Sequence, residues 1–217
     1  MRFTGRAEGD LRPGPSAASS AVGLAERRAV VTALPWTWLT QVHGTRVVDV
    51  LEPGGSAGEE ADAAITTARG AALSVATADC APVVLADRAG TATAVAVVHA
   101  GWRGLAGGIV AAATAALRAA GATDVVAALG PCIHPACYEF GEEDLALVVA
   151  RLGEGARGIT SQGAPALDLP GAVSAVLSSL GVELTVDTAV CTACSDDYFS
   201  HRACGDAERQ ATVVWLP

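Results

Sequence analysis

Strand-like segments follow one another directly in the first half of this 217-residue chain, and this order restricts the possible folds most. Leu73–Asp87 (LSVATADCAPVVLAD) predicts two strands with a break near Pro82, and Thr93–His99 predicts a third, buried strand. The alanine-rich run Gly107–Ala120 then predicts a helix that Gly121 ends. Parallel neighbours need a crossover between them, so we expect an α/β (α+β) fold with mixed β-sheets and helices packed on the outside.

The rest of the chain extends this pattern within one domain. Further helices are predicted at Leu24–Leu34, Glu142–Leu152 and Pro170–Leu180. Further strands are predicted around a turn at His43–Gly44 and at Ala61–Thr67, Asp124–Leu129, Leu184–Val190 and Ala211–Leu216. Hydrophobic residues make up 51% of the chain, enough for a sizeable core, so residues 1–217 predict a single domain. Residues 1–23, rich in Gly, Pro, Ala and Ser from Gly9 onward, predict a poorly structured lead-in.

Charge and cysteine content restrict the partners and the compartment. The net charge of -9 opposes binding to a nucleic-acid backbone. The opening MRFTGRAEGD lacks the apolar stretch of a secretory signal, and no apolar run is long enough to span a bilayer. Six cysteines without an export signal are expected to be reduced thiols or metal ligands. We therefore expect a soluble, cytoplasmic protein that binds neither nucleic acid nor membrane; the sequence carries no signal for its oligomeric state.

Two histidines and one cysteine occur where predicted strands give way to turns. His43 lies in QVHG, Cys80 in TADCAP and His99 in VVHAGWRG. Strand ends on one rim of a sheet are places where binding sites are built. Each residue alone is more often a core thiol or a hydrogen-bonding histidine. Together, two imidazoles and a thiolate are ligands that zinc takes, with a fourth position left for water or substrate.

Charged residues flank these candidate ligands. Arg103 opens a glycine-rich entry into the helix predicted from Gly107, where backbone N–H groups and a guanidinium would make an anion site. The alternative is a surface role for Arg103 and a core role for Trp102. Asp79, beside Cys80, is a candidate for orienting a metal ligand or acting as general base; otherwise it is a turn residue.

The remaining cysteines suggest a weaker second pattern. Cys191 and Cys194 form a CxxC directly after a predicted strand, which suits a redox pair, half of a structural zinc site or two buried thiols. Cys132 and Cys137 would have to be the partner pair, and their spacing is wider than in the usual zinc knuckle. A second metal site is therefore the less favoured interpretation.

Several phrases in a fixed order are similar to one protein family. They are QVHG (41–44), ADAAITT (61–67), TADCAPVVLAD (77–87), HAGWRG (99–104), LGPCIHPACYEFG (129–141) and CTACSDDYFSHR (191–202). From Trp36 to the C-terminus the chain resembles the YfiH/YlmD family, also described as laccase-domain or multicopper polyphenol oxidase proteins. The resemblance implies a YfiH-like fold and a zinc-dependent purine nucleoside phosphorylase with adenosine deaminase side activity. Its implied partners are purine nucleosides and phosphate.

The resemblance also implies roles for individual residues. The family's metal ligands correspond to His43, Cys80 and His99. Its basic pocket residues correspond to Arg103 and Arg202, which would hold phosphate for attack on the anomeric carbon. Catalytic roles are expected for Cys80, Asp79 and Arg103, with Asp79 carrying a proton, and Gln41 of QVHG is expected to bind substrate.

The chain departs from the family pattern near both ends. The opening FTGRAEGD is short, and only Glu26–Arg27 matches the family's Asn-Arg phrase. Ala203–Cys204 and Glu208–Arg209 replace an Arg-Asp and a Gly-Arg phrase. These departures leave the three candidate metal ligands unchanged and bear on the substrate site.

Three other functions would use the same residues. A copper-dependent polyphenol oxidase would use the two histidines and the cysteine, but a blue-copper site adds an axial methionine and Met1 is the sole methionine. Four histidines are also too few for a multicopper cluster. A cysteine hydrolase would use Cys80 as nucleophile with His99 or His43 as base. A non-catalytic metal-binding module is the fourth hypothesis, because the N-terminal segment is short.

Overall fold

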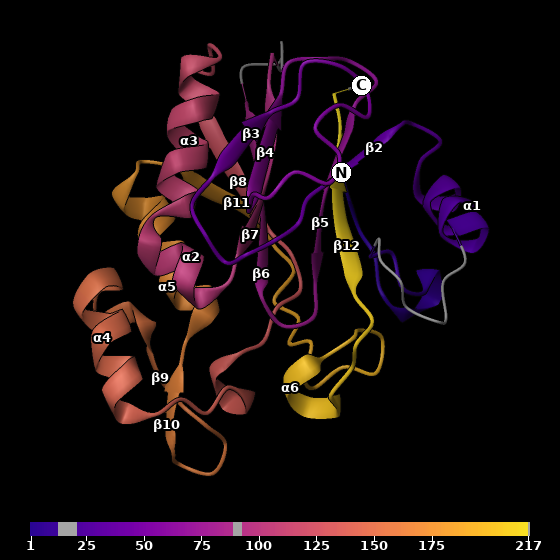
Figure 1. Ribbon diagram of the computed structural model, residues 1–217. Helices are drawn as coiled ribbons and strands as arrows, with labels where there is room; N and C mark the ends of the chain where they lie inside the picture. The colour runs from indigo at the N-terminus through magenta and orange to yellow at the C-terminus, as the bar shows by residue number, and fades with distance from the viewer. Residues whose placement is uncertain (13–20, 89–92, 217) are drawn as a thin grey trace.

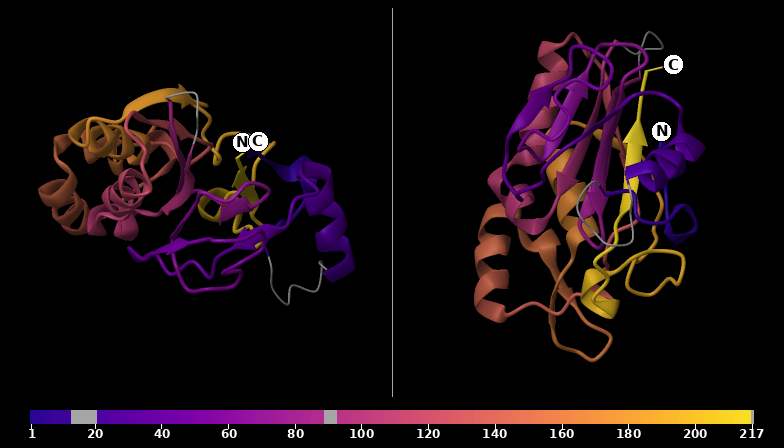
Figure 2. Two further views of the ribbon diagram at one scale, coloured as in Figure 1. Left: turned by 90° about the horizontal axis from the view of Figure 1, so that it is seen from above. Right: turned by 45° about the vertical axis from the view of Figure 1, so that its right-hand side comes forward.

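Two β-sheets packed face to face lie between helices in the computed structural model, which describes residues 1–12, 21–88 and 93–216 (Figures 1 and 2). The larger sheet contains β3 (Val47–Asp49), β4 (Ala63–Thr66), β6 (Ala81–Asp87), β7 (Val95–Ala100), β8 (Val125–Leu129) and β11 (Glu183–Asp187). The smaller sheet contains β1 (Arg2–Phe3), β2 (Trp36–Trp38), β5 (Ala72–Thr77) and β12 (Gln210–Val214). A separate hairpin joins β9 (Arg157–Ile159) and β10 (Pro165–Leu167).

The helices of the described residues surround these sheets. They are α1 (Ala21–Val31), α2 (Trp102–Gly107), α3 (Ile109–Ala119), α4 (Glu142–Leu152), α5 (Leu169–Ser179) and α6 (His201–Cys204). Short 3-10 turns are η1 (Arg6–Glu8), η2 (Pro135–Cys137) and η3 (Glu154–Ala156). In Figure 1, α2, α3, α4 and α5 lie on the side of the larger sheet, and α1 lies beyond the smaller sheet. None of the helices in the described part of the chain combines the length and apolar character needed to cross a membrane.

Both sheets are mixed, as the order of strands along the sequence predicts. The larger sheet has the order β11-β8-β6-β7-β4-β3, and the smaller sheet has the order β1-β12-β5-β2. Within the larger sheet β6 pairs antiparallel with β7, whereas β8 pairs parallel with β11. The predicted single-domain α/β class with mixed sheets and outer helices is confirmed.

Alternating side chains place the core in three layers. Successive residues of a strand point to opposite faces of its sheet. Val83 and Val98 therefore pack with the helices beside the larger sheet, while Val84 and Val97 pack between the two sheets. Trp36 belongs to a third cluster on the outer face of the smaller sheet, which α1 covers. Because the centre of the larger sheet is buried on both faces, its strands β6, β7 and β8 are almost uninterrupted apolar runs.

The beginning of the chain differs from the prediction. β1 pairs antiparallel with β12, and Leu11 is buried in the cluster around Trp36. The predicted poorly structured lead-in is therefore wrong for residues 1–12, whereas residues 13–20 lie outside the described residues. Local composition missed this order because the stabilising contacts come from the other end of the chain.

A short helix replaces the predicted glycine-rich entry after β7. α2 begins at Trp102, and Gly108, with a φ of 99°, separates it from α3. The predicted helix Gly107–Ala120 is confirmed as α3. The anion site expected at this entry stays a prediction; the side chain of Ile109, the first residue of α3, is completely buried.

Candidate metal centre and its cavity

His43, Cys80 and His99 meet at one end of the packed sheets. Their ligand atoms all lie within 4.8 Å of one another. Nε2 of His43 is 3.7 Å from Sγ of Cys80, and the two imidazole rings meet edge to face with centroids 4.8 Å apart. Cys80 directly precedes β6 and His99 lies in β7, at positions that alternate onto the face between the sheets. The structure thus brings together all three residues predicted as metal ligands.

Asp62 fixes two of the three ligands. Its carboxylate is fully buried, and Oδ1 accepts hydrogen bonds from Nδ1 of His99 at 2.7 Å and from the backbone amide of His43 at 2.9 Å. Oδ2 accepts from the backbone amide of Gly44 at 2.6 Å. Because Nδ1 of His99 donates to Asp62, Nε2 is the ring nitrogen that faces the other ligands, and it would release its proton when a metal binds. Asp62 is not among the site residues predicted from the sequence; its one signal was its position immediately before the apolar strand of ADAAITT.

Charge pairing holds these groups in ionised forms. Burial favours the neutral acid, but hydrogen bonds from His99 and from the Gly44 and His43 amides lower the pKa of Asp62. Burial also opposes the thiolate of Cys80, yet the positive His99 ring and a hydrogen bond from His43 lower the pKa of Cys80 to about 6. Against its own burial, the pKa of His99 rises to about 9 beside Cys80 and Asp62. Cys80 is therefore already in the deprotonated form that a metal requires.

The backbone around the ligands is closely packed. His43 has a left-handed φ of 59°, which turns the QVHG segment sharply. A Cβ on Gly101 would lie 2.5 Å from Cδ2 of His43 and 3.2 Å from Sγ of Cys80. Gly101 therefore leaves the space that the His43 ring occupies. Two imidazoles, one thiolate and a carboxylate that orients a histidine fit a transition-metal ion, and both zinc and copper take such ligands.

A cavity of about 520 Å³ lies beside these ligands. His43, Cys80 and His99 contribute to its wall, together with apolar side chains such as Leu39 and Val75. Three arginines also line it: Arg12, Arg28 and Arg209. Burial lowers the pKa of Arg28 to about 10, and the pKa of Arg209 is lowered by burial and by the charge of Arg12. Arg12 and Arg28 escaped prediction because they fall in segments expected to be a lead-in and an ordinary helix.

Gln41 lines the cavity, but the backbone already engages its amide. Nε2 donates to the carbonyl of Ala76 and Oε1 accepts from the amide of the same residue, both at 2.8 Å. Gln41 thus ties the QVHG segment to β5. This geometry favours a positioning role over a direct hydrogen bond to substrate.

Asp79 points toward a loop near the C-terminus. Its Oδ1 accepts hydrogen bonds from the hydroxyls of Thr192 and Ser200, both at 2.7 Å, and its Oδ2 accepts from the backbone amide of Arg202 at 2.7 Å. Asp79 also has a left-handed φ of 98°. With these three donors engaged, the carboxylate anchors the loop. It is Asp62, and not Asp79, that orients a predicted metal ligand.

Arg103 and Arg202 lie against an aromatic cluster formed by Trp102, Tyr138 and Phe140. The guanidinium of Arg103 stacks on Trp102 at 4.4 Å, and that of Arg202 lies 4.9 Å from the centre of the Tyr138 ring. Burial and the nearby Cys80 raise the pKa of Tyr138 to about 12, although both arginines oppose this rise. Neither arginine is among the residues that line the cavity.

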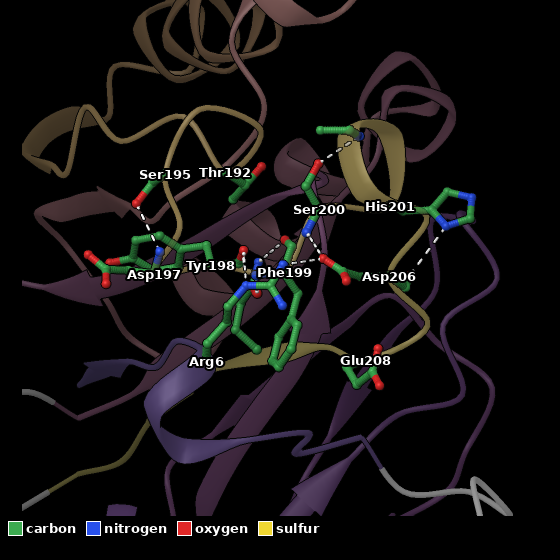
Figure 3. Close-up of polar contacts among 12 residues, drawn as sticks. Arg6, Thr192, Ser195, Asp197, Tyr198, Phe199, Ser200, His201, Asp206 and Glu208 are labelled. Carbon is green, nitrogen blue, oxygen red and sulfur yellow. Dashed lines mark hydrogen bonds and ion pairs between the residues drawn. The ribbon is translucent and has the colours of Figure 1, made fainter. Parts of the chain in front are cut away.

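The loop of residues 192–208 is held in place from the other end of the chain (Figure 3). Arg6 donates hydrogen bonds to the side chain of Asp206 and to the carbonyl of Tyr198. The backbone amide of Ser200 also donates to Asp206, at 2.8 Å. The ordered opening segment therefore supports the loop that Asp79 anchors.

Comparison with known proteins shows to which family this chain belongs. Residues 16–217 match the family described as multi-copper polyphenol oxidoreductase laccase. The chain belongs to this family. It is 43% identical over 183 residues to the purine nucleoside phosphorylase ORF3 of Streptomyces griseus. The aligned region covers 82% of this chain and 73% of that protein. The predicted resemblance to the YfiH/YlmD family is confirmed.

Solved structures of this laccase-like family share the fold. The Neisseria meningitidis protein NMB0706 superposes with a TM-score of 0.79 at 32% identity, covering 95% of this chain and 86% of that one. YlmD from Geobacillus stearothermophilus superposes with a TM-score of 0.73 at 26% identity, covering 94% and 84%. Membership in this laccase-like family, together with the clustered histidine and cysteine ligands, indicates a metal-binding protein.

Proposed function

We propose that the protein is a zinc-dependent purine nucleoside phosphorylase that also deaminates adenosine. Relatives from Streptomyces griseus, Streptomyces coelicolor and Escherichia coli are named purine nucleoside phosphorylases. The observation that carries the proposal is the shared wall of the 520 Å³ cavity, where three metal-ligating side chains and three arginines face one volume. Cavities of this size hold small organic ligands.

Phosphorolysis requires a cationic site for phosphate beside the nucleoside. In the proposed reaction a phosphate oxygen bonds to the anomeric carbon, and the N-glycosidic bond breaks with its electron pair leaving on the base. We assign the phosphate to the arginines of the cavity wall, Arg12, Arg28 and Arg209, because charge attraction is stronger in a partly dehydrated cavity. The sequence-based assignment to Arg103 and Arg202 is the competing proposal.

The apolar part of the wall suits the base and sugar faces of a nucleoside. Leu39 and Val75 belong to the core between the sheets and also border the cavity. Gln41 holds this wall in register with β5. These residues would position the nucleoside near Cys80, while the arginines hold phosphate.

The ligand set supports zinc as the metal. Zinc bound at this site would supply a Lewis acid that lowers the pKa of water, the chemistry that deamination of a purine requires. The chain's contribution is to hold the ligands, through the hydrogen bonds of Asp62 to His99 and to the backbone of His43. A blue-copper site adds an axial methionine, and Met1, the sole methionine, is about half exposed and does not line the cavity.

The direct test is incubation of adenosine or inosine with phosphate and purified protein, followed by chromatography and metal analysis. We expect phosphate-dependent release of free base, formation of inosine from adenosine, and loss of the zinc bound beside the cavity in Cys80→Ala. Zinc-loaded protein that yields neither free base nor inosine would refute the proposed activity. Stoichiometric copper with intense thiolate-to-copper absorption would instead support the oxidase.

A further inference from the structure

A second group of ligand atoms lies outside the cavity wall. The Sγ atoms of Cys137, Cys191 and Cys194 all lie within 4.8 Å of one another, and those of Cys137 and Cys194 are 2.9 Å apart. All three are free thiols; Cys194 is exposed and the other two are half-buried. No fourth histidine, cysteine or carboxylate among the described residues joins this group. We refer to it as the three-thiol cluster.

The backbone aligns the two segments that supply these thiols. Cys132 and Cys191 form a parallel bridge, and the amide of Thr192 donates to the carbonyl of Cys132 at 3.1 Å. The amide of Cys194 donates to the carbonyl of Cys191 at 3.2 Å, closing the CxxC turn. The amide of His134 donates to Sγ of Cys191 at 3.4 Å. This contact fixes the position of the Cys191 sulfur beside the other two sulfurs.

The arrangement fits a metal better than a disulfide. A bond between Cys137 and Cys194 would use two of the three sulfurs, would leave Cys191 without a partner, and would need an oxidant. Three thiolates together are a ligand set for zinc and other thiophilic ions. The spacing from Cys132 to Cys137 made a metal site the less favoured interpretation of the sequence. The structure removes that objection, because Cys132 aligns the backbone and contributes no sulfur to the cluster.

We propose that Cys137, Cys191 and Cys194 bind a second zinc ion, with water in the fourth position on the exposed side of Cys194. Each thiol would release its proton to solvent as the metal–sulfur bond forms. This site is independent of the cavity and of the proposed phosphorylase activity.

The position of the three-thiol cluster suggests what the ion would do. Tyr138, part of the aromatic cluster, directly follows Cys137 in sequence. Thr192, which lies between the two cysteines of the CxxC, donates to the carboxylate of Asp79. An ion at the three-thiol cluster would therefore join the segment that carries Tyr138 to the loop that Asp79 anchors. Its role would be structural.

Metal content measured on matched variants tests the proposal. The wild-type protein, purified with zinc and dialysed, should contain about two zinc ions per chain, and both Cys80→Ala and Cys137→Ser/Cys194→Ser should contain about one. Cys204→Ser is the control, because Cys204 is an exposed thiol outside the cluster, and it should retain both ions. The zinc that remains beside the cavity of the double variant, together with an unchanged circular dichroism spectrum, would show that this variant is folded.

Cobalt substitution gives a readout that is independent of stoichiometry. In Cys80→Ala loaded with cobalt, thiolate-to-cobalt absorption should persist, and it should vanish when Cys137→Ser/Cys194→Ser is added. A single zinc in the wild type that Cys80→Ala removes would overturn the proposal. A Cys137–Cys194 disulfide found by mass spectrometry in protein purified without reductant would overturn it as well.

Discussion

The two sulfur-containing clusters of this protein are built in different ways. His43, Cys80 and His99 stand at the ends of paired strands or in the turn beside them, are backed by the buried carboxylate of Asp62, and face a cavity. The three-thiol cluster lies on two surface segments that a backbone bridge aligns. A site that acts on substrate needs rigid backing and an open side, whereas a site that joins two loops needs neither. This difference supports the proposal that the first cluster serves chemistry and the second serves structure.

The strongest test of this division is Cys80→Ala. Removing the thiolate should abolish metal binding at the cavity and lower the rate of phosphorolysis and deamination by about 10³-fold, because a bound metal contributes several kcal/mol to such reactions. Steady-state kinetics with adenosine and phosphate measures the loss. Cys137→Ser/Cys194→Ser is the matched comparison and should keep its activity within about threefold at moderate temperature. Equal losses in both variants would contradict the assignment of separate roles.

The protonation of Cys80 distinguishes the two clusters in a second way. In metal-stripped protein, its lowered pKa predicts that alkylation by iodoacetamide rises as the pH increases through about 6. His99 stays protonated until about pH 9, so the thiolate keeps its partner throughout that interval. Mass spectrometry of the alkylated peptide gives the rate at each pH. Saturating zinc should protect Cys80; labelling that continues with zinc bound would favour the cysteine hydrolase.

Asp62→Asn tests the backing that only the cavity site possesses. An asparagine keeps the shape but removes the charge that pairs with His99, so zinc affinity should fall by roughly 10- to 100-fold. Competition with a chromophoric chelator measures this affinity. Asp79→Asn serves as the control, because Asp79 contacts the 192–208 loop, and its zinc affinity should stay near that of the wild type. A larger effect at Asp79 would reverse the roles given to the two aspartates.

The smallest expected effect separates the two proposals for phosphate. Arg12→Gln should raise the KM for phosphate by about tenfold, the loss expected for one charge-assisted hydrogen bond, with little change in the KM for nucleoside. Arg103→Gln should leave the phosphate KM nearly unchanged, since Arg103 stacks on Trp102 away from the cavity wall. The opposite result would support binding of phosphate by Arg103 and Arg202.

The sequence allowed prediction of features that depend on local pattern. Runs of buried valine and alanine predicted the strands of the larger sheet, and Gly108 and Gly121 lie close to the ends of α3. His43, Cys80 and His99 were predicted as ligands from their chemistry and their positions at strand ends. These features required no knowledge of which segments meet in space.

The missed features all depend on contacts between distant segments. Asp62 falls within the predicted strand Ala61–Thr67, and its role becomes visible only when β4, which follows it, is placed beside β7, the strand of His99. Arg12 lies in the cavity wall because β1 pairs with β12 and Leu11 is buried. The three-thiol cluster required the alignment of Cys132 with Cys191. No local spacing encodes these distances, because each is set by packing.

The hydrogen bonds that Asp62 accepts affect how a metal ion binds to the site. One carboxylate holds the imidazole of His99 and the backbone amides of His43 and Gly44, so the positions of these groups are settled when the chain folds. The loss of conformational entropy occurs at that stage and does not weaken the later capture of an ion. The ion enters a preorganised site, and access through the cavity, more than rearrangement of the protein, should govern how fast it exchanges.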